Sequence, residues 1–227
     1  RKLGVTVVKL LFIAVIAVIV AGSCLALGTA EGIIASAPDV STIDVSPEGY
    51  ATKIYDDGGN EIQTLSTSGS NRIYVDVEDI PITLQHAFIA IEDERFYDHN
   101  GIDLQGILRA GVRGITHGFH FSEGASTITQ QLLKNNVFTG WTSESSFSDK
   151  LERKLQEQYL AVQLEKSVSK DWILENYLNS INLGQNTLGV QSASRRYFNK
   201  DVSELNISES AVIAAITQNP SRYNPVS

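Results

Sequence analysis

The chain reads Ile91-Glu92-Asp93-Glu94-Arg95-Phe96-Tyr97-Asp98-His99-Asn100-Gly101 at the end of an apolar segment, and Gly124-Ala125-Ser126-Thr127-Ile128-Thr129-Gln130-Gln131 follows further along. The first stretch gathers carboxylates beside two aromatic residues. The second is rich in hydroxyl and amide side chains, and Lys134 stands close behind it. Together they supply a candidate general base, hydrogen-bonding groups for a sugar and a cation for a phosphate. This combination indicates chemistry on a phosphorylated, hydroxylated substrate.

The N-terminal part predicts a membrane anchor. Residues 10–30 contain no charged side chain, and as a helix they are long enough to cross a hydrocarbon core of about 30 Å. Arg1, Lys2 and Lys9 precede this run, and no basic residue follows it before Lys53. By the positive-inside rule, we expect a single-pass protein of the cell membrane with a cytoplasmic N-terminus and an extracytoplasmic catalytic domain.

A cleaved signal peptide is the alternative, because Ala-Gly-Ser-Cys at 21–24 loosely matches a lipoprotein cleavage site. The apolar run is longer than the roughly 7–15 residues of a signal core, which favours the uncleaved anchor. The single cysteine, Cys24, is interpreted as a small apolar residue of the anchor, and it can form no internal disulfide.

The charge balance excludes one class of partner. Beyond residue 30 the chain carries 15 basic and 26 acidic residues, a formal net charge of −11. Such a surface is a poor attractor for nucleic acid, so any phosphate site must be built locally from clustered lysine and arginine side chains. The chain contains no methionine and ends at Asn-Pro-Val-Ser, so we expect it to be part of a longer protein.

The pattern along the chain divides it into three parts. We expect the cytoplasmic tip and anchor at 1–35, a linker with short β structure at 36–80, and a helical domain at 81–227. Within the linker, 52–55 and 62–65 predict a hairpin around a glycine-rich turn, and 72–77 a further strand. The division rests on composition and spacing alone.

Beyond the linker, the apolar periodicity is helical. Pro81 suits the first turn of a helix that ends near Glu92, and Asp103 can cap a second helix. Ser126 or Thr127 can cap a third. The predicted strongest helix spans 148–166, with an apolar stripe at Leu151, Leu155, Tyr159 and Val162. Further helices are expected at 169–180, 187–197 and 207–218, and a mobile loop at 111–124.

Two carboxylates are candidates for catalysis. Partial desolvation of Glu92 beside Phe96 and Tyr97 would raise its pKa toward the range useful for a general base; a solvated acidic helix end is the alternative. Glu157 is a second carboxylate on another helix, as glycosidic chemistry uses. Its alternative is a surface ion pair with Arg153 or Lys154.

Polar side chains near these carboxylates are candidates for binding. Hydroxyl and amide groups at 126–131 can hydrogen-bond a sugar or pyrophosphate, although ordinary helix capping explains the same pattern. His117 and His120 have the spacing of metal ligands on a helix, but the surrounding glycines indicate a loop, so no protein metal site is expected. We expect His99 to shape the loop after Glu92 by hydrogen bonding.

Several motifs together resemble the peptidoglycan glycosyltransferase domain of class A penicillin-binding proteins and its monofunctional relatives. The family's E-D-x-x-F-x-x-H-x-G occurs at 92–101, G-x-S-T-I-T-Q-Q at 124–131 and R-K-x-x-E at 153–157. Further similarity covers Tyr177-Leu178-Asn179 with Leu183-Gly184, then Arg196-Tyr197-Phe198 and finally 218–225. The similarity extends over roughly residues 50–225, in the same order as in the family.

This resemblance implies a mainly α fold: a lysozyme-like glycosyltransferase lobe, a small jaw subdomain at about 102–124, a short N-terminal β hairpin and one transmembrane helix. The jaw's Ile115, Phe119 and Phe121 would suit contact with lipid. The implied function is polymerisation of lipid II into β-1,4-linked glycan strands for the bacterial cell wall, with release of undecaprenyl pyrophosphate. The family is the target of moenomycin.

The resemblance also implies roles for individual residues. Glu92 would deprotonate the acceptor's 4-hydroxyl, which attacks the donor's anomeric carbon with inversion. Glu157 would orient the cations, or a divalent Mg or Mn ion that assists the leaving group; no other cofactor is implied. Lys150 would replace a phosphate-binding arginine that the family often has. The substrate-binding residues implied are Asp93, Phe96, His99, Gly101, Ser126, Thr127, Gln130, Gln131, Lys134, Lys150, Arg153, Lys154 and Asn179.

The partners implied are lipid II, the growing glycan strand and the membrane bilayer, together with other cell-wall synthesis or division proteins, and no nucleic acid. Two other functions stay open. A lysozyme-like lytic glycan hydrolase would use a similar pair of carboxylates, and an inactive scaffold could bind the lipid-linked precursor. Clustered cations at 134, 153 and 154 favour transfer, because a hydrolase has no pyrophosphate leaving group to neutralise.

Overall fold

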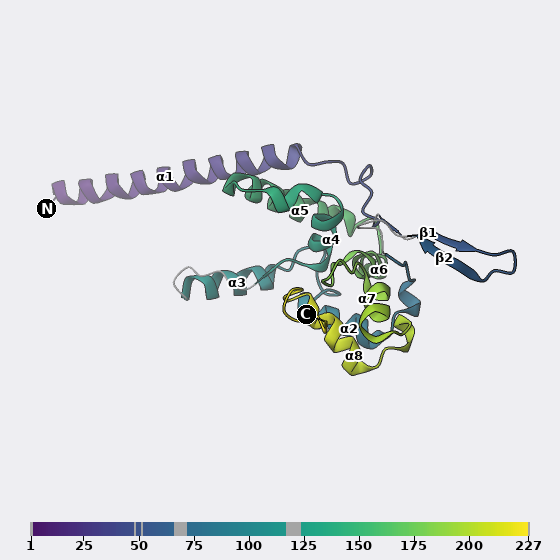
Figure 1. Ribbon diagram of the computed structural model, residues 1–227. Helices are drawn as coiled ribbons and strands as arrows, with labels where there is room; N and C mark the ends of the chain where they lie inside the picture. The colour runs from purple at the N-terminus through teal and green to yellow at the C-terminus, as the bar shows by residue number, and fades with distance from the viewer. Residues whose placement is uncertain (1, 48, 51, 66–71, 117–123, 227) are drawn as a thin grey trace.

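The long buried helices expected from the apolar periodicity form most of the structure. A computed structural model describes the chain except for residues 1, 48, 51, 66–71, 117–123 and 227 (Figure 1). The α-helices are α1 (Lys2–Ala35), α2 (Ile82–Glu92), α3 (Leu104–Thr116), α4 (Ile128–Asn136), α5 (Phe147–Leu164), α6 (Lys170–Ser180), α7 (Val190–Phe198) and α8 (Ile207–Ile216). The short elements are strands β1 (Thr52–Tyr55) and β2 (Glu61–Leu65) and 3-10 helices η1 (Val77–Asp79), η2 (Thr139–Ser143) and η3 (Val202–Glu204). The mainly helical prediction is therefore confirmed.

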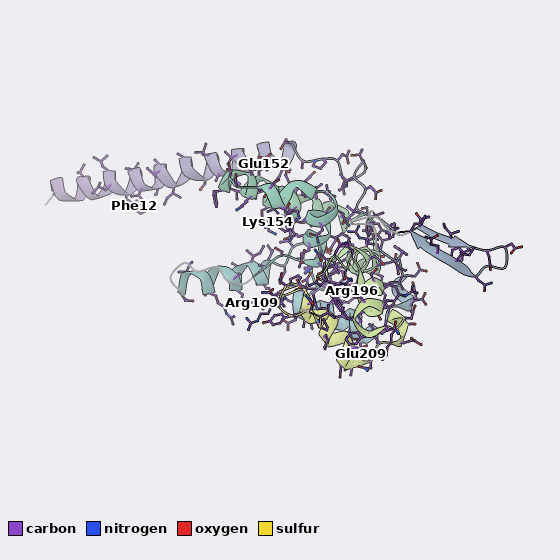
Figure 2. The ribbon with its side chains drawn as sticks, in the orientation of Figure 1. Phe12, Arg109, Glu152, Lys154, Arg196 and Glu209 are labelled. Atoms are coloured by element: carbon purple, nitrogen blue, oxygen red, sulfur yellow. The ribbon has the colours of Figure 1, made fainter. Side chains whose placement is uncertain are left out.

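Helix α1 is apolar on every side and projects from the body of the molecule (Figure 1). The segment Lys9–Ala35 is long and apolar enough to cross a membrane by length and composition. Its large side chains are exposed, as Phe12 (Figure 2) and Leu25 show, so this part of the helix does not pack against the rest of the protein. An apolar helix exposed all round is suited to a lipid environment.

The last turn of α1 is attached to α5. The Gln156 side chain donates hydrogen bonds to the carbonyl oxygen of Ile33 (3.3 Å) and to Ser36 Oγ (3.1 Å). Gln156 is almost completely buried between the two helices, which lie side by side at this end of α1 (Figure 1). These bonds add to those that Ser36 already makes to the Ile33 carbonyl, and they attach the end of α1 to α5.

The core lies where α2, α4, α6 and α8 meet. Helix α2 packs on α8, and the short α4 packs on both α5 and α6. Five of the nine residues of α4 are buried, including the polar Thr129 and Gln130. Helix α4 is thus the central element of the lobe, and its polar residues are enclosed by its neighbours.

The predicted hairpin is present, but the further strand at 72–77 is not. Strands β1 and β2 pair antiparallel and project from the lobe on the side opposite α1 (Figure 1). Arg72 makes one isolated bridge with Tyr50. The backbone of Val75 instead pairs with the Asn179 side chain, which accepts from its N–H (3.0 Å) and donates to its carbonyl (2.8 Å). Helix α6 takes the place of a neighbouring strand.

Two helix predictions need correction. Helix α3 continues to Thr116, so the predicted loop does not begin at Gly111; its apolar residues recur at three- and four-residue spacing, and Gly114 is buried within it. The remainder of that loop, with His117, His120, Phe119 and Phe121, lies outside the described residues. On α5 the predicted apolar stripe is at most partly buried. The buried face instead carries Glu157, Leu160, Ala161 and Leu164. The Glu157 carboxylate can lie on this face because Arg153 and Lys154 pair with it.

Gly101 fixes the distance between the 93–101 turn and α5. Its φ of +89° lies in the region that favours glycine, and a Cβ atom there would lie 2.6 Å from the backbone carbonyl of Ala161. A backbone carbonyl within a helix, here in the last turn of α5, cannot move aside as a flexible side chain could. No other residue type allows the turn to approach α5 this closely.

We expect Gly101→Ala to lower stability by about 3 kcal/mol or more, from left-handed strain and overpacking together. Thermal unfolding should show a fall in Tm of about 6–12 °C for a domain of this size. Gly59→Ala is the matched control, because Gly59 has a similar φ of +80° and open space around it. Equal losses in the two variants would contradict the close approach to α5.

Candidate active site

The site is organised by the buried carboxylate of Asp93, the residue that follows α2. Asp93 Oδ2 accepts a hydrogen bond from the backbone N–H of Ile128 (3.0 Å), the first residue of α4. His99 Nε2 lies 2.9 Å from the same oxygen, and His99 Nδ1 accepts from the Gly101 N–H (3.2 Å). Because Nδ1 is the acceptor, Nε2 carries the proton and donates to Asp93. The end of α2, the 93–101 turn and the start of α4 are thereby joined.

Glu92 is half-buried at the end of α2 and lines a polar cavity of about 130 Å³. Its carboxylate accepts hydrogen bonds from Gln131 Nε2 (2.8 Å) on α4 and from Gln218 Nε2 (3.3 Å) after α8. Neutral amides hold this carboxylate in place without neutralising it. The geometry leaves a partly exposed carboxylate at the cavity wall.

A second cavity, of about 300 Å³, lies next to the first and is rich in cations. It is lined by Ser126, Gln130, Gln131, Lys134, Trp141, Arg153, Lys154 and Glu157. Ser126 lines both cavities, and Gln131 lines this one while donating to Glu92. The predicted base and the predicted phosphate-binding cations therefore share one region of the molecule.

Glu157 is the anionic centre of this cation cluster. Only 1% of Glu157 is exposed, and its carboxylate is paired with Arg153 Nη1 and with Lys154 Nζ (3.1 Å). A buried carboxylate requires such partners, because an unpaired charge would be too costly to bury. The ion pair named as the alternative is present with both cations, but the Glu157 carboxylate is buried and does not lie at the surface.

Lys154 connects the cluster to α4. Its Nζ donates to Ser126 Oγ (2.7 Å), just before α4, and to Gln130 Oε1 (3.1 Å), within α4. Gln130 in turn donates to the carbonyl of Gly101 (3.3 Å), as does Thr127 Oγ1 (2.8 Å). The hydroxyl and amide groups expected to bind substrate are therefore also hydrogen-bonded to other parts of the protein. Thr127 in addition caps α4 by accepting from the Gln130 N–H.

The surroundings of Lys134 and Arg153 shift their pKa values in opposite directions. Burial lowers the pKa of Lys134, whose ammonium group lies 4.6 Å from the centre of the Trp141 ring. Burial also opposes the charge on Arg153, but hydrogen bonds to Glu144 and Glu157 outweigh it and raise the Arg153 pKa. Arg153 is therefore permanently charged, while Lys134 gives up its proton more readily than an exposed lysine.

Some predicted substrate-binding residues lie in the supporting framework instead. Phe96 is completely buried, with Lys170 Nζ 4.4 Å from its ring centre. Asn179 is also buried, and its side chain is bonded to the backbone of Val75 and Glu175. Lys150 is exposed and is not part of the cation-lined cavity, so the structure gives no support for its replacing a missing arginine.

Three residues at the site were missed from the sequence. Glu144 accepts from Arg153 Nε at 2.8 and 2.9 Å, Trp141 covers Lys134, and Gln218 contacts Glu92. The 139–147 segment has no helical periodicity that would orient Glu144 or Trp141 toward α5. Gln218 is the first residue of the last family motif, at 218–225, and its place in that motif was the signal that could have identified it as a site residue.

In the described part of the chain, no group of three or more His, Cys, Asp or Glu side chains could hold a metal ion. Glu157 lines the cation-rich cavity, and both Glu157 and Glu144 are bonded to Arg153.

A helical lobe with a carboxylate beside a cation-lined cavity defines a candidate enzyme of group transfer from phosphates. Residues 58–227 match the family model described as Transglycosylase, and the chain belongs to that family. It is 43% identical over 205 residues to penicillin-binding protein 1A of Clostridium novyi, covering 89% of this chain and 23% of that protein. The identity is 47% over 179 residues to penicillin-binding protein 1A of Clostridium acetobutylicum, covering 78% and 22% respectively.

Penicillin-binding protein 1F of Bacillus subtilis is 46% identical over 176 residues, or 78% of this chain and 23% of its own length. The chain therefore spans about a quarter of the length of these curated relatives. The resemblance to the glycosyltransferase domain of class A penicillin-binding proteins is confirmed by these matches.

We expect Asp93→Asn to destabilise the domain by about 1–3 kcal/mol, because it removes a buried anionic acceptor from Ile128 and His99. Chemical denaturation with a fixed m value measures the loss. Asp98→Asn is the control, since Asp98 belongs to the same turn but is exposed. Equal stability of the Asp93→Asn and Asp98→Asn variants would contradict the stabilising role of the buried Asp93 carboxylate.

Proposed function

We propose that this chain polymerises lipid II into β-1,4-linked glycan strands as an inverting peptidoglycan glycosyltransferase. The observation that carries the proposal is the position of Glu92 at one cavity beside a second cavity lined by Lys134, Arg153 and Lys154. Family membership supports the same reaction. Because the relatives are much longer, the activity of the whole protein is part of the proposal.

In the proposed reaction, the Glu92 carboxylate takes the proton of the acceptor's 4-hydroxyl group. The oxygen attacks the donor's anomeric carbon from the face opposite the phosphate, and the bond from that carbon to the phosphate oxygen breaks. The leaving group is undecaprenyl pyrophosphate, and configuration inverts at the anomeric carbon. Gln131 and Gln218 would keep Glu92 oriented toward the acceptor.

Charge on the departing pyrophosphate would be stabilised by Lys134, Arg153 and Lys154, which are already fixed in place by the protein. Fixed cations stabilise developing charge without reorganising during the reaction. Glu157 would keep Arg153 and Lys154 oriented, and a Mg or Mn ion bound to the phosphates would add further positive charge. The hydroxyl and amide groups of Ser126 and Gln131 would bind the donor between the two cavities.

The proposed location is the outer face of the cell membrane, with α1 as a single-pass anchor and its N-terminus in the cytoplasm. Helices α1 and α3 project to the same side of the lobe (Figure 1). Leu104, Leu108, Val112 and Ile115 on α3 are exposed, which suits entry of α3 into the lipid interface. A lipid-linked substrate would then reach the cavities from the bilayer. Cell-wall synthesis or division proteins remain the proposed protein partners.

A lytic hydrolase is the second candidate function, since Glu92 and Glu157 could form a pair of carboxylates. The structure disfavours it, because Glu157 is buried and fully engaged by Arg153 and Lys154. A carboxylate so engaged cannot readily serve as a nucleophile or proton donor. An inactive scaffold would not require a partly exposed carboxylate such as that of Glu92 at the wall of a cavity.

We expect Glu92→Gln to lower the rate of glycan polymerisation from lipid II by at least about 100-fold, because the amide cannot accept the proton. The assay follows polymer length by gel electrophoresis with the full chain in detergent. Glu152→Gln removes the same charge from an exposed site on α5 and should leave the rate unchanged (Figure 2).

Polymer formation at the parent rate by Glu92→Gln would overturn the proposal. Digestion of preformed glycan by the parent, without growth of polymer from lipid II, would favour the hydrolase. Lipid II binding without either reaction would favour the scaffold.

We expect the affinity for inorganic pyrophosphate to fall as the pH rises through the lowered pKa of Lys134, because the ammonium group then loses its charge. Lys134→Arg keeps its charge over this range. Relative to that variant, the parent should lose about tenfold in affinity before the pH reaches the ordinary range of lysine titration, as titration calorimetry can measure. Changes in the charge of pyrophosphate itself affect both proteins equally, so parallel curves would exclude Lys134 from the phosphate site.

A further inference from the structure

Tyr177, in α6, lies beneath the helix that carries Glu92. It is completely buried, and its ring meets the ring of Phe88 edge to face, with the two centres 6.1 Å apart. Phe88 and Glu92 are four residues apart on α2, so both project from the same face of that helix. The phenol of Tyr177 is therefore packed under the face of α2 that presents the carboxylate.

The Tyr177 hydroxyl has no hydrogen-bond partner among the residues that the structure describes. A buried hydroxyl without a partner is costly, and tyrosine hydroxyl groups inside proteins are nearly always bonded. Phenylalanine would fill the same space without this cost. The hydroxyl therefore calls for an explanation other than packing.

The negative charges of two carboxylates act on this hydroxyl group. Burial is the main cause of the raised Tyr177 pKa, and the negative charges of Glu92 and Asp93 raise it further. The phenol thus keeps its proton and can act as a hydrogen-bond donor to a neighbouring anion. Each carboxylate already accepts from two protein groups. Asp93 is buried, whereas Glu92 is only half-buried and keeps an exposed edge that can accept from a water molecule.

We propose that Tyr177 is a positioning residue for Glu92, to which its hydroxyl donates a hydrogen bond through one buried water molecule. This inference rests on the proposed role of Glu92 as the general base. A water at this place would have the polar partners it needs, since Tyr177 and the carboxylates of Glu92 and Asp93 supply one donor and several acceptors. The bond would complete a support that Gln131 and Gln218 provide from the other elements.

The proposed bond favours the ionised form of Glu92, because the donor stabilises a negative charge. The other charged groups around Glu92 are the same in the parent and in a variant without the Tyr177 hydroxyl. These groups are Asp93 and Glu94 at the end of α2, Arg95 and Asp103 in the turn, Arg109 on α3, and Lys134 on α4. Removing the Tyr177 hydroxyl should therefore change the pH dependence of the reaction, while the rest of the surroundings of Glu92 stay the same.

Tyr177→Phe tests the proposal, because it keeps the ring and removes only the hydroxyl. The pH dependence of kcat is measured with lipid II and the full chain in detergent. We expect the acidic limb to move up by about half to one pH unit, and kcat near neutral pH to fall roughly threefold to tenfold. We expect Tm to change little, since the variant keeps the packed ring and loses only one water-mediated hydrogen bond.

Tyr197→Phe is the matched control. The Tyr197 hydroxyl donates to the carbonyl of Leu183 (2.7 Å), away from Glu92, so its loss should lower Tm without moving the pH profile. A Tyr177→Phe profile that superimposes on that of the parent would overturn the role of Tyr177. If Glu92→Gln is inactive in the same assay, the proposed function stands despite that result; if Glu92→Gln is fully active, the proposed function itself fails.

Discussion

The Asp93 carboxylate holds together the parts of the lobe on which the site depends. It is buried and accepts hydrogen bonds from the first N–H group of α4 and from His99. A carboxylate at the N-terminus of a helix is favoured both by the unpaired N–H groups and by the helix dipole. Since Glu92 precedes Asp93 and the polar stretch at 126–131 opens α4, this one interaction sets the distance between the proposed base and the residues facing it.

Gly101 provides the second constraint on this arrangement. The turn that begins at Asp93 returns to α5 at Gly101, whose carbonyl accepts from Thr127 and Gln130. Helix α5 carries Arg153, Lys154 and Glu157, so its contact with Gly101 places the cations beside α4. Carboxylates of Glu144 and Glu157 then hold Arg153 in a locally cationic cavity of a chain whose formal net charge is −8.

Most helices could be predicted from the sequence because their caps and apolar spacing are strong local signals. The end of α2 near Glu92 was predicted from such signals, as was a cap of α4 by Ser126 or Thr127, of which Thr127 is the one observed. The strand at 72–77 was wrong because its backbone finds Asn179 as a partner, a contact 104 residues away in the sequence. The continuation of α3 was missed because its glycines were interpreted as loop residues, although tertiary context overrides such local preferences.

The candidate site could be predicted only in part. Motif spacing grouped Glu92, Lys134, Arg153 and Lys154 correctly into one region. It could not separate residues that line the cavities from those that support them, because both kinds belong to the same motifs. Phe96, His99 and Asn179 are buried or bonded within the framework, and only the three-dimensional contacts reveal this. Trp141 and Glu144 lie in an irregular segment, where sequence spacing gives no direction to a side chain.

The position of a bound substrate tests the central claim most directly, namely that a base and a pyrophosphate site adjoin one another. A crystal structure of the protein with a lipid II analogue should place its two phosphates within hydrogen-bond distance of Lys134, Arg153 or Lys154. An acceptor sugar in the same crystal should present a hydroxyl oxygen within about 3.2 Å of a Glu92 carboxylate oxygen. Phosphates bound instead between Arg95 and Arg109, or an acceptor hydroxyl directed away from Glu92, would contradict the claim.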